Sequence, residues 1–90
     1  MPPKTAQYEA ICRVLESDDF TPGEKHCLQW QFAQMVPMGS FFTALWQAIE
    51  LADPTNRAAL RLGFPDDVAA HASYKSGYLA PRWEAFGVAF

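Results

Sequence analysis

Residues 38–54, MGSFFTALWQAIELADP, hold a single charged residue before their final Asp-Pro pair and are otherwise rich in bulky apolar side chains and alanine. On a helix the apolar positions fall on two neighbouring sides: Phe41, Leu45, Ala48 and Ala52 on one, and Phe42, Trp46 and Ile49 on the other. An apolar arc this wide exceeds what a helix at the protein surface needs. We therefore expect a central helix, covered by the helices before and after it, with Phe41, Leu45 and Ile49 in the core. We do not include Trp46 among these expected core residues, because large aromatic side chains are seldom fully buried.

The strongest local helix start is TPGEK, residues 21–25. Thr21 can act as the N-cap, and Pro22 fits the first helical position because its missing N–H costs nothing there. Glu24 completes a capping box with Thr21. The sequence predicts that this helix continues until Pro37 forbids it.

Similar signals divide the rest of the chain. Ser40 is expected to cap the third helix, Asp53 is expected to cap the fourth, and Gly63 is expected to be the C-cap that follows the fourth. The predicted helices cover residues 4–17, 22–36, 41–52, 54–62 and 65–75, with a helical turn near 81–86. Because no stretch shows strand alternation, the sequence predicts an all-α fold. We expect a small compact bundle of four to five short helices with an aromatic-rich C-terminal segment.

Length and composition narrow the function as well as the fold. A chain of 90 residues fits one helical domain over 1–90, and its ends, 1–3 and 87–90, are expected to fray. Half of the residues are apolar and 14% are aromatic, so some aromatic side chains must lie at the surface. The net charge is −3 and the seven Lys and Arg residues are scattered, which argues against direct nucleic-acid binding.

The cysteines and the N-terminus indicate the compartment. Cys12 and Cys27 are too few for a disulfide scaffold and fit a reducing cytosol. The start MPPKTAQYEA lacks the apolar core of a signal peptide, and no apolar run is long enough to span a bilayer. We expect a soluble, cytoplasmic protein that does not enter membranes.

Histidine and cysteine give little support for catalysis or metal binding. His26 and Cys27 are adjacent, so on a helix they point about 100° apart and cannot form a nucleophile–base pair. A metal site built from these two with Cys12 and His71 lacks the CxxC or HxxxH spacing that holds two ligands on one element. We expect no metal and no cofactor.

Two acidic pairs could suggest paired carboxylates for acid–base catalysis. Asp18 and Asp19 form one pair, and Asp66 and Asp67 form the other. Each pair lies at a predicted helix boundary, where Asp is favoured for capping and for its interaction with the helix dipole. Since no phosphate loop or catalytic serine motif accompanies them, we expect no catalytic residues and no enzyme.

The C-terminal segment holds the most informative surface candidates. Tyr78, Trp83 and Phe86 lie among further apolar and basic residues after the fifth predicted helix. One interpretation is that this tail folds back as a lid over the bundle. The other is an exposed protein-binding patch, because aromatic residues and arginine are enriched at interface hot spots. A self-complementary version of that patch would produce a homodimer.

Residues 39–71, GSFFTALWQAIELADPTNRAALRLGFPDDVAAH, resemble small proteins encoded by tailed bacteriophages and prophages. The shared pattern covers about a third of the chain and consists of Phe41, Phe42, Ala44, Leu45, Ala48, Ile49, Ala52, Asp53, Asn56, Leu60, Gly63, Phe64, Pro65 and Val68. Most of these positions are predicted core or cap residues, so the resemblance supports the fold and gives no site. It implies a dispensable phage accessory protein, a class that includes inhibitors of host CRISPR and other antiviral systems.

These observations favour a non-enzymatic binding protein in the bacterial host cytoplasm. Its partner would be a host defence protein or complex, which it would inhibit, like an anti-CRISPR protein, by occupying a surface. An acidic face that includes Asp18, Asp19, Asp66 and Asp67 would steer it toward basic channels.

Two other functions stay open. The first is an oligomeric helical sponge that holds a nucleotide second messenger between aromatic faces and basic groups such as Lys25, Arg57 or Arg61. The second is a non-enzymatic phage structural or regulatory subunit. The sequence does not identify a target or an oligomeric state.

Overall fold

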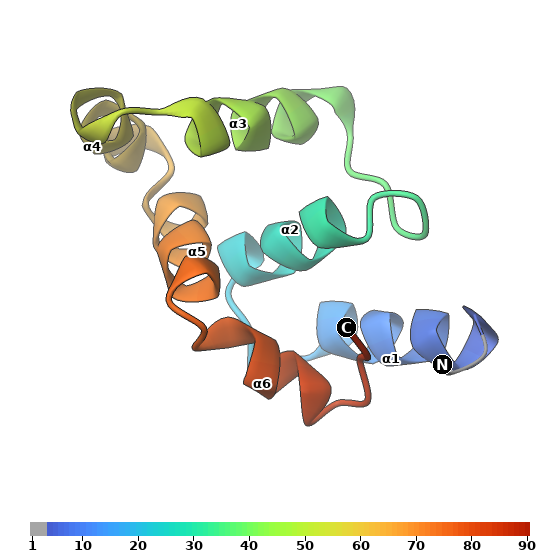
Figure 1. The fold of residues 1–90 in the computed structure, drawn as a ribbon. Helices are drawn as coiled ribbons and strands as arrows, with labels where there is room; N and C mark the ends of the chain where they lie inside the picture. The colour runs from blue at the N-terminus through green and yellow to red at the C-terminus, as the bar shows by residue number, and fades with distance from the viewer. Residues whose placement is uncertain (1–3) are drawn as a thin grey trace.

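The computed structural model describes residues 4–90, and within them the chain forms six helices and no strand. The helices are α1 (Lys4–Glu16), α2 (Pro22–Gln31), α3 (Ser40–Leu51), α4 (Pro54–Gly63), α5 (Pro65–Lys75) and α6 (Leu79–Glu84). They form three tiers, with α3 and α4 at one end, α2 in the middle, and α1 and α6 at the other end (Figure 1). The predicted all-α bundle is confirmed.

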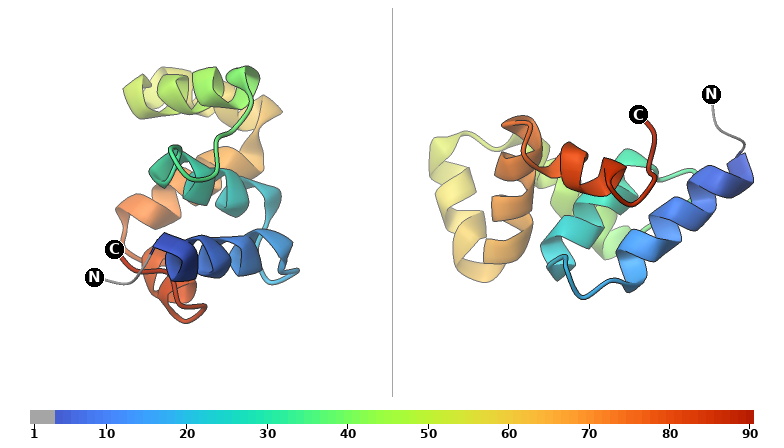
Figure 2. Two further views of the ribbon diagram at one scale, coloured as in Figure 1. Left: turned by 90° about the vertical axis from the view of Figure 1, so that its right-hand side faces the viewer. Right: turned by 90° about the horizontal axis from the view of Figure 1, so that it is seen from below.

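The helix pair at the centre of the molecule is α2 and α5. Figure 2 shows α5 running from the tier of α4 down to the tier of α6, so that it touches every tier. The two helices cross at Gly23, where a Cβ atom would lie 2.2 Å from the backbone oxygen of Asp66. Only glycine permits this approach, because any side chain there would overlap the backbone of α5.

The start of α2 is built as the sequence predicts. The Thr21 side chain accepts a hydrogen bond from the Glu24 N–H at 3.1 Å, and the Glu24 carboxylate accepts one from the Thr21 N–H at 2.8 Å. This capping box satisfies two backbone donors that a helix leaves unpaired. It therefore fixes where α2 begins, one residue before the crossing glycine.

The expectation that the third helix is central is wrong. One side of α3 packs on α2 and α5, while α4 packs on α5. Leu45 and Ile49 are buried as expected, and Trp46 is fully buried, but Phe41 is 61% exposed. The reason is that α4 turns away to pair with α5 and leaves one side of α3 uncovered.

Three predicted helix ends also differ from the structure. The second helix ends at Gln31, and a turn over residues 32–36 brings Val36 into the core before Pro37. Gly39, not Ser40, occupies the N-cap of α3, and no side chain caps that helix. Gly63 is the last residue of α4, so the corner between α4 and α5 falls at the following residue.

The last four residues, which the sequence predicts to fray, are attached to α1 in the structure. The Gln7 side chain donates to the Ala89 carbonyl at 2.7 Å and accepts from the Ala89 N–H at 2.9 Å. Arg13 donates to the Phe86 carbonyl at 3.1 Å, and Val88 is buried. The C-terminal segment is thus tied along α1; residues 1–3, also expected to fray, lie outside the described residues.

Replacing Gly23 by alanine tests the central crossing. We expect Gly23→Ala to lower the free energy of unfolding by about 3 kcal/mol, since the new methyl group must push α2 from α5. Gly63→Ala is the matched control, because a Cβ there meets nothing within 4 Å. Urea denaturation of both variants gives the comparison, and equal stability would refute the close crossing.

Candidate functional site

The outward side of α3 carries exposed apolar side chains, with the polar Ser40 and Gln47 among them. Phe41, Ala44, Ala48 and Leu51 are all exposed there, although α3 already buries Leu45, Trp46 and Ile49 on its inward side. Leu51 is 86% exposed. A helix that buries one apolar side and presents a second has a surface with no partner inside the chain.

The next helix continues this surface. None of the ten residues of α4 is buried, and its outward side carries Thr55, Ala58, Ala59 and Leu62. Leu62 is 89% exposed. We call these eight residues of α3 and α4 the α3–α4 surface; none of them is charged.

A groove lies between the two helices. Its volume is about 340 Å³, and its lining consists of Ala48, Leu51, Ala52, Asn56, Ala59 and Leu60. Alanine predominates, so a side chain or a helix from outside can approach the two backbones closely. Glu50 and Arg61 stand next to lining residues in the sequence and add one charge of each sign.

A polar cluster beneath the groove holds α3, α4 and α5 together. Arg57 of α4 donates to Nδ1 of His71 at 3.0 Å and to the Ile49 carbonyl at 3.4 Å. Glu50 Oε1 lies 3.4 Å from His71 Nε2 and 3.5 Å from Lys75 Nζ. Burial lowers the pKa of His71 from its usual 6.5, and the Arg57 charge lowers it further, against the opposing effect of Glu50.

Asp67 is a core residue and not part of an acidic face as expected. Its Oδ1 atom accepts hydrogen bonds from the Trp46 indole at 3.1 Å and from His26 Nδ1 at 2.7 Å. The residue is only 6% exposed. One carboxylate oxygen therefore joins α2, α3 and α5, so the role of Asp67 is structural.

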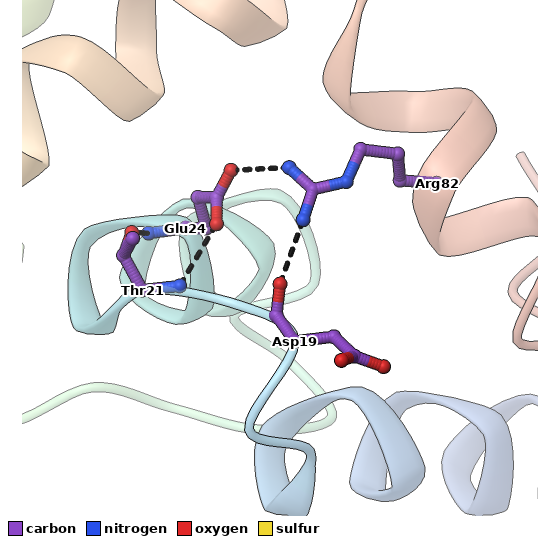
Figure 3. Close-up of polar contacts among 4 residues, drawn as sticks. All are labelled: Asp19, Thr21, Glu24 and Arg82. Carbon is purple, nitrogen blue, oxygen red and sulfur yellow. Dashed lines mark hydrogen bonds and ion pairs between the residues drawn. The ribbon is translucent and has the colours of Figure 1, made fainter.

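The other three aspartates remain at the surface near the start of α2. Asp18, Asp19 and Asp66 are exposed, and Asp66 lies against Gly23 at the crossing. The Asp19 carbonyl accepts from Arg82 at 2.7 Å, and the same guanidinium donates to Glu24 at 2.6 Å (Figure 3). Arg82 thereby fastens α6 to the loop before α2 and neutralises part of this acidic end.

The C-terminal aromatic residues do not form one exposed patch. Trp83 is fully buried, with its ring 5.7 Å from Tyr74 and 5.9 Å from Phe90, and Phe86 is half-buried against Phe20. Only Tyr78 of the three predicted binding residues is exposed, at 75%. In this structure the segment forms the lid that the sequence left as one of two interpretations.

The cysteines and histidines are placed for packing. Cys27 is buried, and this burial raises the pKa of its thiol to about 12, so it stays protonated and unreactive near neutral pH. Within residues 4–90 no three His, Cys, Asp or Glu side chains gather in a way that could hold a metal ion.

No helix within residues 4–90 is long and apolar enough to cross a membrane.

No family model, curated protein or solved structure matches this chain. The α3–α4 surface is thus identified from its own geometry. Sequence reasoning missed it because it predicted a central third helix that the helices before and after it would cover. A usable signal was present: Leu51 and Leu62 lie outside the predicted core positions.

Removal of the Trp83 side chain distinguishes a lid from an interface. Trp83→Ala should lower the free energy of unfolding by about 3–5 kcal/mol, because it leaves a large cavity under the lid, and should leave the oligomeric state unchanged. Tyr78→Ala is the exposed control and should cost less than about 0.5 kcal/mol. Thermal melts and sedimentation test both variants; a stable Trp83→Ala protein with altered association would restore the interface interpretation.

Proposed function

We propose that this chain is a non-catalytic binding protein that acts by occupying a surface on another protein. The observation that carries the proposal is the α3–α4 surface, whose Leu51 and Leu62 are 86% and 89% exposed. Single exposed apolar side chains are ordinary, whereas exposed apolar side chains gathered around a groove are typical of interaction sites.

The groove supports a helix of the partner as the occupant. Its alanine lining allows backbones to approach, and the exposed side chain of Leu51, which lines the groove, can enter a space on the partner. An amphipathic helix laid between two helices buries its apolar side in this way. The partner segment we propose is therefore an apolar helix face with few charges.

The partner we propose to test first is a host defence component. The likeness of residues 39–71 to small phage and prophage proteins supports this choice. The exposed Asp18, Asp19 and Asp66 near the start of α2 support steering toward a basic surface during encounter. Charge would speed the approach, and the apolar contact would supply most of the binding free energy.

The alternatives receive less support from the geometry. Of the basic groups considered for a nucleotide sponge, Arg57 is used inside the chain by His71 and Ile49. A second copy of this chain would use the same α3–α4 surface, and sedimentation of the purified protein at rising concentration would detect it. A phage structural subunit would give no effect on host defence.

Charged substitutions on the α3–α4 surface test the proposal. We expect Leu51→Glu and Leu62→Glu each to weaken partner binding by about 2 kcal/mol or more, because each places a carboxylate in the contact. Both should change the free energy of unfolding by less than about 0.5 kcal/mol, since the side chains are exposed. Tyr78→Glu, at an exposed position elsewhere, is the matched control.

The readout is plaque formation by a CRISPR-targeted phage on bacteria that express each variant. The wild-type chain and Tyr78→Glu should restore plaques, and the double variant Leu51→Glu, Leu62→Glu should not. No rise in plaque number with the wild-type chain would overturn the defence target. Full activity of a stable double variant would overturn the α3–α4 surface as the contact.

A further inference from the structure

The helix α4 is attached to the molecule in an unusual way. None of its residues is buried, although Leu60 is partly covered. Its interior polar contacts come from Arg57, which donates to His71 Nδ1 at 3.0 Å and to the Ile49 carbonyl at 3.4 Å. A helix with so little apolar anchoring depends strongly on such contacts for its position.

The contact with Arg57 specifies the protonation state of His71. A guanidinium group has donors and no acceptor, so Nδ1 of the imidazole must present its lone pair. The proton of the neutral ring is then on Nε2, 3.4 Å from Glu50 Oε1 and without a hydrogen-bond partner among the described residues. Arg57 can therefore bind only a neutral His71.

The charged groups around His71 come from three helices. Arg57 reaches it from α4, Glu50 from α3, and Lys75, on α5 itself, pairs with Glu50 at 3.5 Å. On α2, burial raises the pKa of the Cys27 thiol to about 12, and the same Glu50 and Lys75 charges also act on this pKa. The thiol therefore stays neutral. His71 is 4% exposed, and its burial together with the Arg57 charge keeps its pKa below the usual 6.5 in spite of Glu50.

We infer that Arg57 and His71 form a proton-sensitive latch that holds α4 in place and thereby maintains the groove of the α3–α4 surface. When a proton from solvent adds to Nδ1, two donors face each other across 3.0 Å, and the guanidinium must leave. Detachment of Arg57 removes the main polar anchor of α4. Only the expected consequence of this opening, the loss of partner binding, rests on the proposed function.

The direction of the pH effect follows from linkage. With α4 detached, His71 is open to solvent and has a pKa near the unperturbed value of about 6.5, whereas in the closed state its pKa is lower. Protons therefore favour the open state as the pH falls below about 6.5. Between the two pKa values the ratio of open to closed protein rises at most about tenfold for each pH unit.

Amide NMR of the full chain tests the latch. We expect the amides of α4, such as Ala58 and Ala59, to lose protection from exchange between pH 7.5 and 5 with the same midpoint as the His71 ring. Amides of α1, such as Ile11, should stay protected. His71→Gln, which keeps an acceptor and does not titrate, should make α4 insensitive to pH, while His26→Gln should leave the transition unchanged.

A second variant keeps the test decisive if His71→Gln does not fold. Arg57→Met keeps the aliphatic stem and donates no hydrogen bond, so α4 should lose protection already at pH 7.5. The latch is overturned if α4 in the wild-type chain stays protected down to pH 5, or if Arg57→Met leaves it closed. If α4 opens as expected and partner binding persists, the latch stands and the α3–α4 surface is overturned as the contact.

Discussion

The close crossing of α2 and α5 at Gly23 is the constraint on which the arrangement of the other helices depends. A Cβ atom at this position would lie 2.2 Å from the Asp66 oxygen, so the two backbones are in direct contact. This approach brings Asp67, the next residue of α5, within reach of His26 on α2 and Trp46 on α3. A buried carboxylate with two donors is stable only while both remain in place. The crossing therefore also fixes the inward side of α3.

The exposed surface is a consequence of the same arrangement. Because α5 occupies the centre, α4 folds back along it and does not cover the outward side of α3. Leu51 and Leu62 are left in solvent, with 86% and 89% of their surfaces exposed. The opposite end of the molecule is closed, since Trp83 and Val88 are buried under the C-terminal lid. The α3–α4 surface thus lies at the end of the molecule away from this lid (Figure 1).

Local rules predicted much of the fold. The capping box at Thr21 and the start of α5 at Pro65 are found where the sequence places them. Residue spacing could not show which side of residues 40–52 faces the core, because both sides are apolar and the choice depends on where α4 packs. It also could not show that Asp67 is buried, since Asp66 beside it has the same capping chemistry and stays exposed. The α3–α4 surface could not be predicted for the same reason, because it includes the side of α3 that no other helix covers.

Photo-crosslinking inside bacterial cells tests the central claim, that the α3–α4 surface is where this chain meets its partner. A photoreactive phenylalanine analogue is placed at Leu51, at Leu62 or, as the control, at Tyr78, which is similarly exposed elsewhere on the surface. We expect irradiation to give the same discrete crosslinked protein from positions 51 and 62 and none from position 78. Crosslinks from position 78 alone, or none from positions 51 and 62 in cells where the chain is active, would contradict the account.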